Sequence, residues 1–417
     1  MSESVELSHA HQMPVVPTTG DDSVFLLLEL NSQESNEVNR SPINLSLVLD
    51  RSGSMTGEPL EYCKEASKFV VNQLSNYDIM NLVVFDDEVD TVFHSQNVTN
   101  KNVLKNRIDT IETGGITNLS GGLIQGCQNI LTQKTKEYVN RVILLSDGVA
   151  NSGITDAINL QKIAEDYSTA GAVITTMGVG DHFDEELLEG IANAGNGNYH
   201  FIDQLETIPN IFEKELDGLL SVVAQNVSLN LTPAPGVKIK NISGYHSKET
   251  DEGIEVRLGD SYSKEKKSVL IECSLPSHKQ GLADMLHVDW SFMDVTYGVK
   301  ECKFQRTITI EYTSDLEKLS SQPNPSVEKQ IEITKSAKQL EQALHLFDEG
   351  DMDGGKKLLY SNALHMESRA VELNDEELLA ESEVVLHHVQ NFDYSENKRK
   401  ALHAEKYRRM KRGKRES

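Results

Sequence analysis

Three oxygen-bearing side chains stand at alternate positions where an apolar run near the start of the chain ends. The run INLSLVLD, at residues 43–50, closes with Asp50, and Ser52 and Ser54 follow it. Alternate positions in an extended or turning segment point the same way, so one carboxylate and two hydroxyl groups converge on a small volume. Mg²⁺ binds oxygen ligands in octahedral geometry and keeps positions open for water or a ligand. The stretch therefore predicts part of a site for a hard divalent cation.

Two more loops offer oxygen ligands of the same kind. The stretch GGITNLSGG at 114–122 supplies Thr117, and LLSDG at 144–148 places Asp147 directly after another buried strand. Open α/β sheets bind ligands at the carboxyl ends of their strands, so we expect the three loops to meet at one edge. A strand that ends in Asp followed by Ser and Gly is also typical of an ordinary turn or helix cap. The combination of three loops favours the metal site over that alternative.

The elements that must hold these loops follow from the hydrophobic pattern. Short runs rich in Val, Ile and Leu alternate with stretches at helical spacing, as in a parallel sheet covered on both faces. We expect strands at 43–50, 79–85, 89–94, 141–146, 173–179 and 198–202. We expect helices at about 58–75, 101–112, 119–132, 155–170, 184–195 and 205–221. The strands at 79–94 are joined by only three residues, too few for a crossover, so they should form an antiparallel hairpin at the edge.

This arrangement resembles the von Willebrand factor A (VWA) domain, an α/β, Rossmann-like fold with a doubly wound, mostly parallel sheet. Its metal-ion-dependent adhesion site (MIDAS) uses an Asp-x-Ser-x-Ser loop, a distant Thr and a distant Asp, which match Asp50, Ser52, Ser54, Thr117 and Asp147. The resemblance covers roughly residues 40–221. It implies that the three hydroxyl groups coordinate Mg²⁺ or Mn²⁺ directly and that the two carboxylates act largely through water. The open position of the metal would then take an Asp or Glu of a partner protein.

The rest of the chain shows other patterns. Alternating apolar residues over 222–315 predict a β-sandwich, which we expect the strand at 23–31 to join. Helical spacing returns over 326–392, with two helices joined at DEGDMDGG as a hairpin. We expect residues 1–22 to be disordered and the basic tail at 393–417 to be solvated. Docking of the tail on nucleic acid, on an acidic membrane surface or on the protein's own acidic body stays open. The sequence thus predicts a VWA domain followed by a β-sandwich and a helical region.

Composition and charge exclude several classes of function. The net charge is −25, and residues 398–415 hold ten Lys or Arg and one Glu, so the rest of the chain carries −25 − 9 = −34. Such an acidic body repels nucleic acid. The four Cys residues are too far apart for zinc sites or a secreted disulfide framework. No basic, apolar leader and no apolar run of membrane-spanning length occurs, so we expect a cytoplasmic protein without a membrane span.

The same residues weigh against catalysis. No His lies in the three loops, and Ser52 stands where aspartyl phosphatases of the haloacid type need a second Asp. We therefore expect a metal-dependent binding protein and no enzyme, with an order of parts that resembles bacterial cytoplasmic VWA proteins and, more loosely, inter-alpha-trypsin inhibitor heavy chains. Two alternatives stay open, namely a scaffold that works with a separate AAA-type ATPase and, less favoured, a metal-dependent hydrolase.

Overall fold

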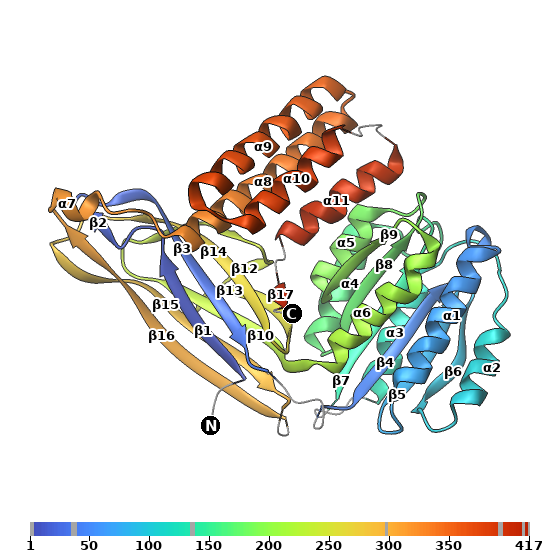
Figure 1. Ribbon diagram of the computed structural model, residues 1–417. Coiled ribbons are helices and arrows are strands. Elements are labelled where there is room, and N and C mark those ends of the chain that lie inside the picture. Colours follow the sequence, from blue (N-terminus) through green and yellow to red (C-terminus); the bar gives the residue numbers. More distant parts are fainter. Residues whose placement is uncertain are drawn as a thin grey trace.

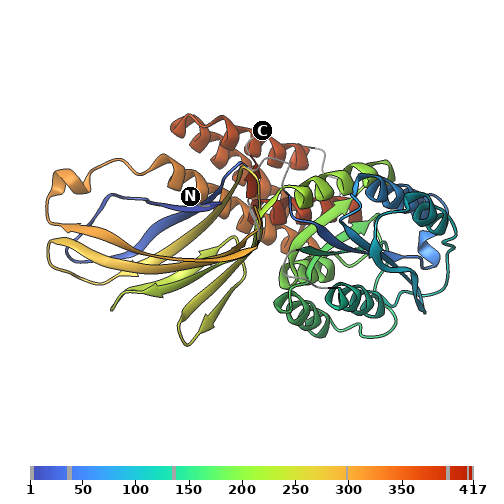
Figure 2. The ribbon, with the colours of Figure 1, turned by 90° about the horizontal axis from the view of Figure 1, so that it is seen from below.

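The computed structural model describes residues 4–34, 40–133, 138–296, 299–390, 395–410 and 413–415. They form an α/β unit, a sandwich of two antiparallel sheets, and a group of helices near the C-terminus (Figure 1). The sandwich lies at one end of the molecule and the α/β unit at the other, as the view turned by 90° also shows (Figure 2). The predicted fold class, a mostly parallel α/β sheet followed by a sandwich and C-terminal helices, is confirmed.

The α/β unit is built on one six-stranded sheet. Its strand order is β6-β5-β4-β7-β8-β9, and only the edge pair β5–β6 is antiparallel, as predicted for the hairpin. Its strands are β4 (Ile43–Asp50), β5 (Ile79–Phe85), β6 (Val89–Asn97), β7 (Val139–Ser146), β8 (Val173–Val179) and β9 (Asn196–Ile202). Every residue of β4, β7 and β8 is buried, because helices cover both faces of the sheet.

Six helices divide between the two faces of this sheet. They are α1 (Glu58–Gln73), α2 (Lys101–Asp109), α3 (Leu119–Thr132), α4 (Ala157–Thr169), α5 (Glu185–Ala194) and α6 (Ile208–Leu220). Leu47 of β4 packs into a core with residues of α1, α2 and α6, whereas its neighbour Val48 packs into a core with residues of α3, α4 and α5. The alternation of side chains along a strand thus gives the sheet two separate cores. The helix predicted at 205–221 begins with a single 3₁₀ turn, η3 (Leu205–Thr207), before α6.

The sandwich consists of two further sheets, with strand orders β1-β3-β14-β11 and β12-β13-β10-β15-β16-β2. The short strand β17 (Gly413–Arg415) also pairs with β14. The other strands are β1 (Val5–His11), β2 (Val15–Pro17), β3 (Asp21–Ser32), β10 (Val222–Pro233), β11 (Lys238–Ser243), β12 (Ser247–Thr250), β13 (Gly253–Tyr262), β14 (Glu265–Leu275), β15 (Gly281–Asp294) and β16 (Lys300–Thr313). The run at 23–30 lies in β3, which pairs with β1 and β14 of the sandwich. Leu28, Leu229, Ile271 and Val288 lie in the core between the two sheets.

The prediction of a disordered N-terminus at 1–22 is wrong for the residues that the structure describes. β1 pairs antiparallel with β3, and β2 pairs parallel with β16. Val5 and Leu7 are fully buried in the sandwich core. Only Val5 and Leu7 alternate with polar residues there, and mostly polar residues follow. So short a pattern does not predict a strand, because the strand depends on pairing with a distant part of the chain.

The C-terminal helices are α7 (Leu316–Leu319), α8 (Pro325–Asp348), α9 (Met352–Leu373), α10 (Glu376–Gln390) and α11 (Glu396–Met410). The hairpin of α8 and α9 is present as predicted, and its core contains Leu340, Phe347, Leu359 and Met366. No helix in the part of the chain that the structure describes is long and apolar enough to cross a membrane.

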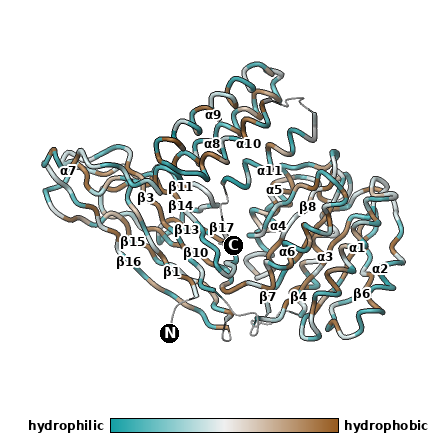
Figure 3. Tube along the Cα trace, viewed as in Figure 1, coloured by the Kyte–Doolittle hydropathy of each residue, from teal (hydrophilic) through white to brown (hydrophobic). Residues whose placement is uncertain are grey.

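The basic tail was expected to be solvated, and this prediction is wrong for α11, which instead follows the alternative of docking on the protein's own acidic body. The helix is coloured mostly as hydrophilic in Figure 3, yet its Lys400, His403, Lys406 and Arg409 side chains are buried. Its Leu402 packs in the core of α8–α10, and its Tyr407 packs in a core of the α/β unit. The helix therefore joins these two parts of the molecule.

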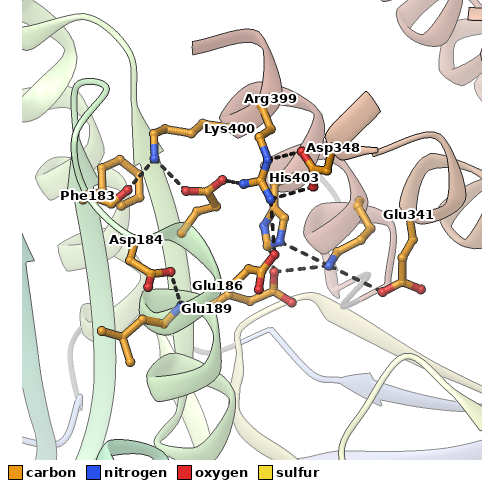
Figure 4. A network of polar contacts seen from close by, with 12 residues as sticks. Phe183, Asp184, Glu186, Glu189, Glu341, Asp348, Arg399, Lys400 and His403 are labelled. Atoms are coloured by element: carbon orange, nitrogen blue, oxygen red, sulfur yellow. Dashed lines mark hydrogen bonds and ion pairs between the residues drawn. The ribbon is translucent and has the colours of Figure 1, made fainter. Parts of the chain in front are cut away.

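Carboxylates of α5 and α8 pair with several basic side chains of α11 (Figure 4). Lys400 Nζ lies 2.6 Å from Glu185 Oε2, and Arg399 Nε lies 2.9 Å from Asp348 Oδ1. His403 Nδ1 lies 2.9 Å from Glu189 Oε2. A charged side chain can be buried when an opposite charge pairs with it. Here the paired carboxylates belong to helices that are far from α11 in the sequence.

Candidate metal centre

Asp50 and Ser146 are the last residues of the neighbouring parallel strands β4 and β7, so their side chains lie at the same edge of the sheet. The opposite edge faces the sandwich, where the Ser41 hydroxyl, ahead of β4, donates to the carbonyl oxygen of Val295. The candidate site therefore lies at the end of the α/β unit that points away from the sandwich (Figure 1).

The carboxylate of Asp50 is fully buried and held on both sides. The backbone N–H of Ser52 donates to Asp50 Oδ1 at 2.8 Å, and the Ser146 hydroxyl donates to Asp50 Oδ2 at 2.6 Å. These two bonds fix the carboxylate at the base of the loop that follows β4. The sequence pattern did not single out Ser146, although it directly precedes the predicted Asp147.

The second Ser of the loop reaches the second Asp. The Ser54 hydroxyl donates to Asp147 Oδ1 at 2.7 Å, and the hydroxyl oxygens of Ser52 and Ser54 lie 3.1 Å apart. Ser54 is exposed to solvent, whereas Ser52 and Asp147 are buried. The loop after β4 and the loop after β7 thus bring four of the five predicted side chains into one hydrogen-bonded group.

Thr117 lies next to this group without a hydrogen bond from its side chain to the other four. A Cβ atom built on Gly148 would lie 3.2 Å from Thr117 Oγ1 and 3.6 Å from Ser54 Oγ, so both hydroxyl groups border the same small space. The backbone of Thr117 is fixed because its N–H donates to Asn151 Oδ1 at 2.8 Å and its carbonyl oxygen accepts from the N–H groups of Asn151 and Ser152. Glycine at position 148 keeps the space beside these hydroxyl groups free of a side chain.

Both acidic residues of the site have raised pKa values. Burial, together with the nearby charge of Asp50, raises the pKa of Asp147 to about 6, although the bond from Ser54 acts to lower it. Burial also raises the pKa of Asp50, while bonds from Ser146 and Ser52 oppose this shift. Two carboxylates that are partly desolvated and close together favour a bound cation, because its charge offsets their repulsion.

The donor set fits a hard divalent cation. It consists of hydroxyl and carboxylate oxygens, which Mg²⁺ prefers, and it contains no sulfur or imidazole. No cluster of three or more His, Cys, Asp or Glu side chains suited to a metal occurs within the described ranges. A metal at this edge of the sheet would therefore depend on the hydroxyl groups of Ser52, Ser54 and Thr117.

Residues that the sequence pattern did not mark as ligands hold the loops of the site in place, and we call them the frame of the site. Arg51 Nε lies 3.1 Å from Asp86 Oδ2, and the carbonyl oxygen of Arg51 accepts from the N–H of Gly114 at 2.7 Å. A Cβ atom on Gly114 would overlap Asp86 Oδ2, so only glycine fits there. Gly114 thus serves the close approach of the two loops. Arg51, directly after Asp50, was the one signal in the sequence for this frame.

Comparisons with known proteins agree with this geometry. Residues 44–214 match the family model of the von Willebrand factor type A domain. The chain is 30% identical over 247 residues to the uncharacterized protein sll0103 of Synechocystis sp., covering 57% of this chain and 58% of that protein. It is 29% identical to the uncharacterized protein YfbK of Escherichia coli, covering 49% of this chain and 36% of that protein. The match to human inter-alpha-trypsin inhibitor heavy chain H3 is 27% identical and covers 46% of this chain and 23% of that protein. The chain thus spans less than two thirds of the length of each of these relatives.

Two solved structures share the fold over nearly the whole chain. A von Willebrand factor type A protein from Catenulispora acidiphila has a TM-score of 0.75 at 17% identity and covers 91% of this chain and 90% of its own. The ArnB paralog VWA2 from Sulfolobus acidocaldarius has a TM-score of 0.68 at 16% identity and covers 98% of both chains. The family match identifies residues 44–214 of this chain as a von Willebrand factor type A domain. The two solved structures share the fold, and the candidate site lies at the carboxyl edge of the sheet of this domain.

Proposed function

We propose that this protein binds a partner protein through a divalent cation, Mg²⁺ or Mn²⁺, held by Asp50, Ser52, Ser54, Thr117 and Asp147 in the manner of a MIDAS. The partner contributes an Asp or Glu side chain to the open position of the metal. VWA domains are a family known for protein–protein interaction and metal-dependent adhesion, and the match over residues 44–214 brings this chain into that family.

The observation that carries the proposal is the hydrogen bond from Ser54 to Asp147 at an exposed position of the carboxyl edge. A Ser hydroxyl can donate its proton to a carboxylate and still offer a lone pair to a cation. Neutral hydroxyl ligands leave the cation electron-poor, so its open position favours an anionic donor. An exposed ligand such as Ser54 leaves that position accessible to a protein partner.

The proposal includes the absence of catalysis. The hydrogen-bonded group contains the hydroxyls of Ser52, Ser54 and Ser146 beside two carboxylates, and none of these hydroxyls has a His partner in it. Activation of a Ser nucleophile typically uses an adjacent His as the base. We assign the site to binding, and we keep the cytoplasmic location expected from the sequence as part of the same proposal.

The experiment compares wild type and Asp50→Ala, with Asp251→Ala in an exposed turn of the sandwich as the matched control. Titration calorimetry with Mg²⁺ measures metal binding, and affinity capture from native lysate with Mg²⁺ or EDTA measures partner binding. We expect wild type and Asp251→Ala to bind Mg²⁺ and to retain a partner only with Mg²⁺, and Asp50→Ala to lose both. Partners that survive chelation and the Asp50→Ala substitution would assign binding to other surfaces and overturn the proposal.

A further inference from the structure

Large apolar side chains are exposed on the loops that carry two of the proposed metal ligands. Ile116 is 51% exposed and directly precedes Thr117, and Val149 is 52% exposed and lies two residues after Asp147. Ile154, further along the second loop, is 40% exposed. We call Ile116, Val149 and Ile154 the apolar rim. Exposed apolar residues that gather at one site indicate an interaction surface, whereas scattered ones are ordinary.

Hydrogen bonds join the two loops of the apolar rim. The backbone N–H of Ile154 donates to Ser120 Oγ at 2.8 Å, and the N–H groups of Asn151 and Ser152 donate to the carbonyl oxygen of Thr117. The loop after β7 is therefore fastened to the loop that contains Thr117 and to the start of α3. The three apolar side chains thus project from a backbone that is ordered before a partner arrives, which lowers the entropy cost of binding.

A second surface of opposite chemistry borders the same loops. Residues 86–90, which form the turn between β5 and β6 and the start of β6, contain four carboxylates, and we call them the acidic turn. Arg51 pairs with Asp86 and Asp90 of this turn, whereas Asp87 and Glu88 are exposed. A Cβ atom on Gly115 would overlap Asp87 Oδ1, which places this carboxylate against the residue that precedes Ile116. An acidic surface therefore begins next to the apolar rim.

We propose that the partner segment carries three features together: an acidic residue for the metal, an apolar side chain that packs on the apolar rim, and a Lys or Arg that faces the acidic turn. This inference rests on the proposed function and specifies its partner. An isolated carboxylate would approach the metal against the repulsion of Asp87 and Glu88, and a neighbouring cation on the partner removes that repulsion. The apolar side chain supplies the burial that a single metal–carboxylate bond lacks.

The test uses a displayed library of random peptides with one fixed central Glu as the probe. The library is selected on the immobilised full chain in Mg²⁺ and eluted with EDTA. We expect enrichment of Leu, Ile, Val or Phe near the fixed Glu and of Lys or Arg at another position. The triple variant Ile116→Ser, Val149→Ser and Ile154→Ser is expected to bind Mg²⁺ as wild type does and to bind the enriched peptides about tenfold or more weakly, which corresponds to about 1.4 kcal/mol.

The matched control changes three exposed apolar residues elsewhere, Val103→Ser, Leu282→Ser and Leu316→Ser, and should leave peptide binding unchanged. Peptides that elute with EDTA but show no apolar or basic preference would overturn this inference and leave the proposed function standing. Failure of wild type to bind Mg²⁺ or any EDTA-released peptide would overturn both. Mg²⁺-dependent self-association in sedimentation that the rim variant abolishes would make a second copy the occupant and would also overturn the inference.

Discussion

The Ser54 hydroxyl donates a hydrogen bond of 2.7 Å to the carboxylate of Asp147, 93 residues further along the chain. The contact exists because β4 and β7 are adjacent and parallel, so the loops that follow them leave the sheet side by side. The bond orients the Ser54 proton toward Asp147 and leaves the lone pairs of the hydroxyl oxygen for another ligand. It is this orientation that makes the loop after β4 suited to a cation.

Stabilisation by metal is expected to depend on the charge of Asp147. Mg²⁺ at 100 times its dissociation constant should stabilise the wild-type fold by about 2.7 kcal/mol, because it binds only the folded site. Asp147→Asn keeps an acceptor for Ser54 but removes the charge, so most of this gain should disappear. Thermal unfolding in Mg²⁺ and in EDTA measures the effect, with Asp251→Asn as control. An equal gain in Asp147→Asn would show that the metal does not bind at this residue.

Thr117→Ala is expected to weaken partner binding more than Mg²⁺ binding. In the VWA family, direct coordination by this Thr accompanies the state that binds a ligand, and here Thr117 borders the site without a side-chain bond to the other four residues. Parallel titrations of Mg²⁺ and of a Glu-containing peptide, with Thr132→Ala at the end of α3 as control, separate the two losses. Equal losses in both titrations would contradict the distinction.

Two glycines of the same site should respond differently to Ala. In Gly114→Ala the new Cβ atom would overlap the Asp86 carboxylate, so we expect a destabilisation of about 1 to 3 kcal/mol. In Gly53→Ala the nearest atom, the carbonyl oxygen of Gly115, is 3.7 Å away, an ordinary contact, and stability should change by less than about 0.5 kcal/mol. Urea unfolding of both variants in EDTA tests the pair. Similar stabilities would show that Asp86 moves aside without cost.

The attachment of α11 is expected to depend on pH through Glu405. Burial opposes its charge, but bonds from Arg408 and the charge of Arg409 prevail and lower the pKa of Glu405 to about 2. Because the folded pKa is lower than the unfolded one, the carboxylate stabilises the helix above about pH 4.3 and loses this effect as the pH falls toward 2.

Glu405→Gln should therefore weaken the protection of α11 amides from hydrogen exchange at pH 7, on the order of 1 to 3 kcal/mol. The difference from wild type should shrink below pH 4. Glu383 is exposed on α10, and Glu383→Gln serves as control. A difference that does not change between pH 7 and pH 3 would show that the charge of Glu405 has no part in holding the helix.

Deletion of residues 398–417 should leave Mg²⁺ affinity unchanged and lower the stability of the chain. The helix α11 lies against α5 and β9, whereas Asp50 ends β4 and Asp147 follows β7, so no ligand loses a contact. The deletion removes the buried Leu402 and Tyr407 and leaves Glu185 without its cations, so we expect easier unfolding. Titration calorimetry and thermal unfolding measure the two effects. A large loss of metal affinity would show coupling between the helix and the site.

The α/β unit and the arrangement of the candidate site could be predicted from the amino-acid sequence. Strands that are buried on both faces are mostly apolar, so β4, β7 and β8 were evident as runs rich in Val, Ile and Leu. The carboxyl ends of parallel strands share one edge, so the order of the strands and loops was enough to place Asp50 and Asp147 together. The predicted and observed strands agree here because each strand is marked by its own run of apolar residues.

The local sequence does not predict that the two chain ends pack into the fold, because this depends on contacts with distant elements. The N-terminal strand β1 and the basic helix α11 have few apolar residues, and their sequences are typical of solvated segments. Lys400 is nevertheless buried, because Glu185, 215 residues away in the chain, presents a carboxylate to its ammonium group. A buried charge is stable only beside its partner, and a partner supplied by a distant element cannot be read from the local pattern.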